Sequence, residues 1–152
     1  MIVSDHGQTT PEHEPSTYRL NTGGVNAYDM RKLGYTVLKK DENGNDLPEI
    51  DWSKTTAHTA SYCHIFINLK GRDPHGIVDP ADKYELEERI ITDLYGYKDE
   101  KTGHRIVALA LHNKDAVLLG LGGPMGSDIV LFLHESYVDD HGPGLSTAYG
   151  HN

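Results

Sequence analysis

The tripeptide Asp-His-Gly occurs twice, once near each end of the chain, and each copy follows an apolar run. Residues 2–7 read Ile-Val-Ser-Asp-His-Gly, and residues 138–142 read Val-Asp-Asp-His-Gly, a few residues after the apolar stretch 129–133. A carboxylate oxygen and an imidazole nitrogen together suit zinc or another first-row divalent cation. The pattern therefore indicates candidate metal ligands. The alternative is that both copies are ordinary His-Gly turns on the surface.

The first copy, Asp5 and His6, is well placed for a metal because it directly follows an apolar run. Neighbouring side chains of a strand point to opposite faces, so both can reach one ion only where the strand has ended. Gly7 supplies the turn that this requires. Ligands of open α/β sheets bind at the carboxyl ends of the strands, which is the position expected for this pair.

The elements that would position such ligands alternate along the chain. β-branched and aromatic residues predict strands at 64–69, 106–111 and 128–133, with an extended piece at 35–38. The best helix is 79–96, with Asp79 as N-cap, Pro80 at the first helical position, and an apolar stripe made by Leu86, Ile90, Ile91 and Leu94. A shorter helix is expected at 27–33.

The connecting segments carry their own signals. Asn43-Gly44-Asn45-Asp46 predicts a hairpin or loop, residues 70–80 and 120–126 are expected to be loops, and residues 55–61 irregular. Residues 114–119 fit either one helical turn or an extended piece. Alternating strands and helices favour an α/β or α+β arrangement, and 152 residues make one domain, 1–152.

Composition limits the partners. The net charge is −9, with 37% hydrophobic residues, which argues against non-specific binding to nucleic acid. A phosphate substrate stays possible, because a bound divalent metal ion makes the local charge positive. Cys63 is the only cysteine, so no disulfide forms within the chain. No apolar run is long enough to span a membrane and no signal-like N-terminus is seen, so a cytoplasmic protein is expected.

Several stretches resemble the alkaline phosphatase superfamily, in particular its type I phosphodiesterase/nucleotide pyrophosphatase branch. Besides Ile-Val-Ser-Asp-His-Gly, they are residues 67–72 (Ile-Asn-Leu-Lys-Gly-Arg) running into 76–78, the helix 84–95, and 141–148 (His-Gly-Pro-Gly-Leu-Ser-Thr-Ala). They follow the family's order over nearly the whole chain. The resemblance implies a partial alkaline-phosphatase-like mixed sheet with flanking helices, truncated at both ends.

The resemblance also implies a phosphate-ester hydrolase with two divalent metal ions, usually zinc. Asp5 and His6 match two ligands of one ion, and His141 matches one ligand of the other. The family's nucleophile and its remaining ligands lie upstream of Ser-Asp-His-Gly, where this sequence starts. We therefore expect this chain to supply metal ligands without the nucleophile, as part of a larger catalytic unit, and to be inactive alone.

Other candidates are weaker. Lys70 and Arg72 could face a substrate phosphate, although charged loops after strands are usually just solvated. The glycine-rich segment 120–126 lacks the Lys-Ser/Thr ending of a P-loop, and the remaining histidines have no partner at ligand spacing. Ser4 beside Asp5 and His6 does not make a triad, which depends on geometry.

The alternative function is an inactive truncated module that binds a partner chain or self-assembles.

Overall fold

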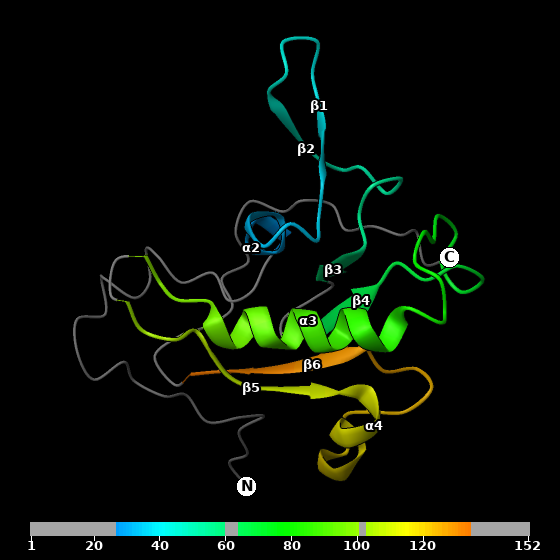
Figure 1. The fold of residues 1–152 in the computed structure, drawn as a ribbon, viewed down its shortest axis with the longest axis vertical. Coiled ribbons are helices and arrows are strands. Elements are labelled where there is room, and N and C mark those ends of the chain that lie inside the picture. The colour runs from blue at the N-terminus through cyan, green and yellow to red at the C-terminus, as the bar shows by residue number, and fades with distance from the viewer. Residues whose placement is uncertain (1–26, 60–63, 101–102, 135–152) are drawn as a thin grey trace, which may run out of the picture.

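The structure, a computed structural model, describes residues 27–59, 64–100 and 103–134 (Figure 1). Asp5, His6 and His141 lie outside these described residues, as does Cys63. The elements are α2 (Ala27–Lys32), β1 (Leu38–Lys40), β2 (Asp46–Ile50), β3 (Ala57–Thr59), β4 (His64–Ile67), α3 (Lys83–Gly96), β5 (Val107–His112), α4 (Asn113–Ala116), the 3₁₀ turn η1 (Val117–Leu119) and β6 (Ile129–Leu133).

The main sheet has four strands in the order β3-β4-β6-β5, and all its neighbours pair antiparallel. β4 and β5 both run antiparallel to β6, so they are parallel to each other with β6 between them. The chain crosses from β4 to β5 through α3, which makes a split β-α-β unit. As a result the carboxyl ends of β4 and β5, the start of β6 and the start of α3 lie at one end of the sheet.

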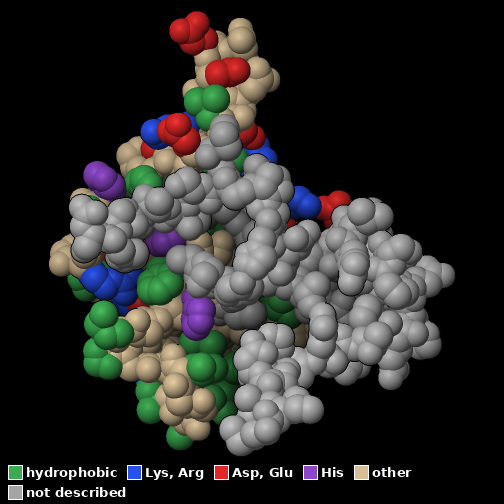
Figure 2. Space-filling view, turned by 180° about the vertical axis from the view of Figure 1, so that it is seen from behind, with side chains coloured by type: hydrophobic (Ala, Val, Ile, Leu, Met, Phe, Trp, Pro, Cys, Tyr) green, Lys and Arg blue, Asp and Glu red, His purple; other side chains and the backbone are tan. Residues whose placement is uncertain are grey.

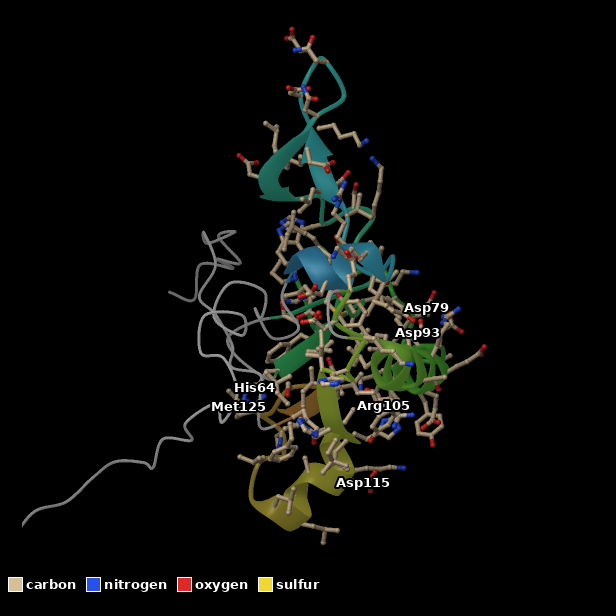
Figure 3. All side chains as sticks on the ribbon, turned by 90° about the vertical axis from the view of Figure 1, so that its left-hand side faces the viewer. His64, Asp79, Asp93, Arg105, Asp115 and Met125 are labelled. Carbon is tan, nitrogen blue, oxygen red and sulfur yellow. The ribbon has the colours of Figure 1, made fainter. Side chains whose placement is uncertain are left out.

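Helix α3 covers one face of the sheet, and Figure 3 shows it end-on beside the strands. Its stripe Leu86, Ile90 and Leu94 is buried and packs into one core with residues of the sheet. Alternation along β4 sends Ile65 and Ile67 into this core. Because the spacing of the apolar residues matches the helical period, burial of one face is what holds α3 on the sheet.

The short helix α2 is tied to α3 by two tyrosines. The Tyr35 hydroxyl donates to Asp93 at 2.5 Å, and the Tyr97 hydroxyl donates to Asp29. Met30 of α2 is fully buried in the main core. These contacts fix α2 against the fold although it has only six residues.

Strands β1 and β2 form a separate two-stranded hairpin that projects from the rest of the molecule (Figure 1). Its loop is organised by Asp41, whose carboxylate accepts hydrogen bonds from the amides of Asn43 and Asn45 at 2.9 and 2.8 Å. Gly44 has φ +84°, a left-handed conformation that glycine adopts without strain. The hairpin signal in the sequence is therefore confirmed.

The mixture of helices and strands is confirmed, and the apolar stripe of α3 is where the sequence predicts it. Every strand pair of the described sheets is antiparallel, with one isolated parallel bridge between Leu69 and Val78, so this part of the chain contains no mixed sheet. Residues 55–61 were expected to be irregular, but 57–59 form β3. Edge strands this short leave no periodic signal.

The start of α3 also differs from the prediction. The helix begins at Lys83 with Asp82 as its N-cap, three residues later than Asp79 and Pro80 indicated. Residues 79–82 instead form a turn in which the Asp82 amide donates to the Asp79 carbonyl at 3.0 Å. The Asp79 carboxylate binds the Lys70 ammonium at 2.7 Å, so it does not cap the helix.

Candidate ligand-binding cleft

A cleft of about 460 Å³ opens at the end of the sheet where the carboxyl ends of β4 and β5 meet the start of α3. Its size is in the range of small-molecule sites. Three segments build it: the loop after β4, the first two turns of α3, and the region from His112 to Asp128. The lining residues are Arg72, Pro80, Lys83, Tyr84, Glu87, His112, Asn113, Lys114, Gly123, Pro124, Gly126 and Asp128.

Asp128 is the central anchor of the cleft. Its two carboxylate oxygens each accept a hydrogen bond of 2.8 Å from the Arg72 guanidinium, and one also accepts the Ile67 amide at 2.7 Å. Burial alone would raise the pKa of the Asp128 carboxyl, but the bonds from Arg72 and Ile67 hold that pKa below its usual value. Asp128 is therefore a permanent anion beneath the cleft.

Lys83 and Glu87 extend this network along α3. The Lys83 ammonium lies 3.0 Å from Asp128 and also donates to Glu87, one helical turn further on. Burial tends to lower the pKa of Lys83, yet its contacts with the two carboxylates raise that pKa overall. The lysine is thus charged, and its position is fixed from two sides.

His112 closes the other side of the cleft. Its Nδ1 lies 2.9 Å from the Glu87 carboxylate, and its Nε2 lies 2.6 Å from the Glu88 carboxylate. The imidazole therefore bridges two carboxylates of α3. The hydrogen bond from His112 lowers the pKa of Glu88. The imidazole also stacks on the Tyr84 ring, with centroids 5.1 Å apart and an angle of 10° between the planes.

The glycine-rich wall of the cleft is held by Asn113. Its side-chain amide donates to the Gly123 and Ser127 carbonyls at 3.0 and 2.7 Å, and its oxygen accepts the Gly123 amide at 3.0 Å. Gly122 packs so closely that a Cβ there would lie 2.1 Å from the Asn113 carbonyl oxygen. The loop was predicted from its glycines, and close backbone packing explains the glycine at 122.

Of the two candidate substrate-binding residues, Lys70 and Arg72, only Arg72 lines this cleft. Lys70 lies two residues earlier in the same loop and pairs with Asp79, half-exposed to solvent. Substrate binding by Lys70 and Arg72 stays a prediction. The metal ligands expected at Asp5, His6 and His141 lie outside the described residues, so their arrangement also stays a prediction.

Sequence reasoning missed Lys83, Glu87, His112 and Asp128. One signal was available in the spacing of these residues. Positions 83, 87, 90 and 94 follow one another at intervals of four, three and four, so Lys83 and Glu87 lie on the same face of the helix as Ile90 and Leu94. Charged residues on a stripe that is otherwise buried need partners from elsewhere in the fold. His112 was expected to lack a ligand partner, and its two carboxylate contacts come from a helix 24 and 25 residues away.

Known families, curated proteins and solved structures were all compared with this chain, and none of them matches it significantly. Among the residues that the structure describes, no group of three or more His, Cys, Asp or Glu side chains is arranged to hold a metal ion. Within the same ranges, no helix is both long and apolar enough to cross a bilayer.

Proposed function

We propose that this chain is part of a metal-dependent phosphate-ester hydrolase of the phosphodiesterase/nucleotide pyrophosphatase type. Asp5 and His6 would bind one divalent ion, and His141 would bind a second; zinc suits these donors. Two such ions would stabilise the attacking and leaving oxygens at phosphorus. The nucleophile would come from outside these 152 residues, in the same polypeptide or in another, and the natural partner would be a nucleotide or another small phosphate ester.

The observation that carries this proposal is the Ser-Asp-His-Gly sequence at residues 4–7, together with the late His141-Gly142. A second observation supports it. The middle stretches of the resemblance, 67–78 and 84–95, form one connected unit, since Val78 of the first shares a core with Ile90 of the second. Gly76 belongs to that unit, because a Cβ there would lie 2.1 Å from the Leu69 carbonyl oxygen.

Zinc content and hydrolysis test the proposal directly. The chain should bind zinc stably once the polypeptide that carries the remaining ligands is added, because two ligands for one ion and one for the other are too few to hold zinc. The single changes Asp5→Ala, His6→Ala and His141→Ala should each reduce the zinc bound by that complex. Loss of one ligand costs at least tenfold in affinity for a site of this kind. His151→Ala is the matched control and should leave the zinc content unchanged.

Hydrolysis of a bis-aryl phosphodiester gives the second readout. We expect no turnover by this chain alone and turnover when a polypeptide carrying the nucleophile is added. Zinc binding that is the same in the wild-type chain and in all three ligand variants would disprove the metal assignment.

A second candidate function is a catalytically inactive module that binds a partner or a second copy of itself. A specific observation favours it: the segment after α4 exposes large apolar side chains, with Leu118 88% and Met125 96% exposed. Val117, Leu119 and Leu121 are also exposed beside them. Figure 2 shows hydrophobic side chains gathered at the end of the molecule opposite the hairpin. Exposed apolar side chains gathered in one region are typical of interaction sites.

Sedimentation of the wild-type chain and of a Leu118→Ser, Met125→Ser double variant distinguishes this function. Self-assembly through the apolar segment predicts a concentration-dependent dimer that the double variant lacks. A wild-type chain that sediments as a monomer at all concentrations would reject self-assembly.

A further inference from the structure

The cleft at the end of the sheet carries more positive charge on its open side than at its base. Three of its lining side chains are cations from three separate segments, namely Arg72, Lys83 and Lys114. Its two carboxylates, Glu87 and Asp128, have side chains only 6% and 5% exposed. Arg72 and Lys83 are 38% and 29% exposed, and Lys114 is exposed as well. In a chain of net charge −9, this cleft presents cations to solvent and keeps its anions underneath.

We propose that the cleft binds the phosphate group of a small molecule. Asp128, Asp73 and the Ile67 carbonyl hold the Arg72 guanidinium, which leaves it few free donors, and Glu87 with Asp128 holds Lys83. These cations therefore need no reorganisation when an anion enters. A phosphate carries enough charge to pair with several cations at once, and lysine ammonium groups bind phosphates as point charges. The volume of about 460 Å³ is large enough for a small organic phosphate.

Donors are available for such a ligand. The Lys83 ammonium has three N–H groups, and its contacts with Glu87 and Asp128 occupy two of them. The Lys114 ammonium lies 5.1 Å from the Tyr84 ring centroid. No carboxylate within residues 27–59, 64–100 and 103–134 lies within ion-pair distance of it, although the Glu88 carboxylate is near enough to interact with its charge. Lys114 is thus the cation in the cleft whose charge is least neutralised by the protein.

The walls of the cleft are also fixed before any ligand arrives. Asn113 holds the loop at Gly123 and Ser127, and the stack of Tyr84 on His112 fixes the opposite side. The half-exposed Tyr84 ring, at 56%, offers an aromatic surface next to the cations. The cleft lies outside the carboxyl ends of β4 and β5, beside the start of α3.

This inference shares Arg72 with the candidate substrate-binding residues of the proposed hydrolase, but it uses none of the candidate metal ligands, so either proposal can fail without the other. Titration calorimetry with inorganic phosphate, and separately with phenyl phosphate, tests it at low ionic strength in the presence of EDTA. We expect saturable binding at one site, weakened by added salt. Lys114→Gln should reduce the affinity about fivefold, as the loss of one exposed charge contact would.

Lys40→Gln is the matched control, since it removes the same charge from an exposed lysine on the hairpin, away from the cleft. Its affinity should equal that of the wild-type chain. Tighter binding of phenyl phosphate than of inorganic phosphate would identify an organic phosphate as the ligand, and the reverse would identify free phosphate.

Nuclear magnetic resonance gives the location. Added phosphate should shift the His112 ring protons and the amides of Gly123 and Gly126, and the same shifts should occur in an Asp5→Ala variant. The proposal is overturned if neither compound binds saturably, or if Lys114→Gln binds as tightly as the wild-type chain. Equal weakening by Lys114→Gln and Lys40→Gln would overturn it too.

Discussion

The guanidinium of Arg72 and the carboxylate of Asp128 face each other across 56 residues of sequence and form two parallel hydrogen bonds of 2.8 Å each. Fork-to-fork pairs of this kind are the strongest ion pairs in proteins, because they combine charge with fixed geometry. Asp128 precedes β6 and Arg72 follows β4, so the pair joins the ends of two neighbouring strands. The same carboxylate binds Lys83 of α3, which connects sheet and helix through one buried anion.

Asp128→Asn should destabilise the fold by about 1.5–3 kcal/mol, since Arg72 and Lys83 lose charge-assisted bonds to Asp128 but keep Asp73 and Glu87 as partners. Urea unfolding at pH 7 measures the loss. Asp79→Asn is the matched control, because the Lys70–Asp79 pair is half-exposed. It should cost about 1 kcal/mol or less. Similar losses from both changes would contradict the anchoring role of Asp128.

Stability should fall as the pH drops from about 6.5 to 4, and His58 is the group responsible. Its ring is buried between Trp52 and Phe66, and burial lowers its pKa to about 4. In that interval the unfolded chain binds a proton that the folded chain does not, so folding loses about 3 kcal/mol.

His58→Leu should remove this pH dependence, as measured by urea unfolding at pH 7, 5.5 and 4.5. His75→Leu, at an exposed histidine, is the control and should keep it. A slope that survives in His58→Leu would assign the effect to other groups. Below about pH 4 both variants should still lose stability. The pKa of Asp128 is lowered in the folded chain, so its ionised carboxylate stabilises the fold, and this stabilisation is lost as the carboxylate becomes protonated.

The bond between Tyr35 and Asp93 should contribute about 1 kcal/mol to stability. Burial, together with the Asp93 carboxylate, raises the pKa of the Tyr35 hydroxyl, so the hydroxyl stays a donor at neutral pH. A double-mutant cycle with Tyr35→Phe and Asp93→Ala measures the coupling between the two side chains. A coupling energy near zero would mean that α2 is held by burial of Met30 and by the Tyr97–Asp29 bond, without help from Tyr35.

The two neighbouring isoleucines of α3 should respond very differently to truncation. Ile90 is fully buried in the core, whereas Ile91 is only partly buried. Ile90→Ala should cost about 2–5 kcal/mol through lost burial and a cavity. Ile91→Ala should cost clearly less, and thermal unfolding of both variants checks the difference. Equal losses of stability in the two variants would contradict the burial of Ile90 in the core.

Local patterns of sequence were sufficient to predict much of the fold. The stripe Leu86, Ile90 and Leu94 has the helical period, and the Asn-Gly pair at 43–44 marks the hairpin. β4, β5 and β6 were predicted to within about two residues at each end. The first residue of α3 was misplaced by three, because Asp79 has a competing partner, Lys70, that helix-capping rules do not consider.

The sequence by itself identified candidate metal ligands, including Asp5, His6 and His141. It also identified the helices and strands whose apolar residues repeat with a clear period. Only the tertiary structure decided which charged residues meet. Arg72, Lys83, Glu87, His112 and Asp128 come together because β6 inserts between β4 and β5 and brings the ends of three segments to one place. Contacts between residues 25 to 56 positions apart depend on strand order, which no local pattern encodes.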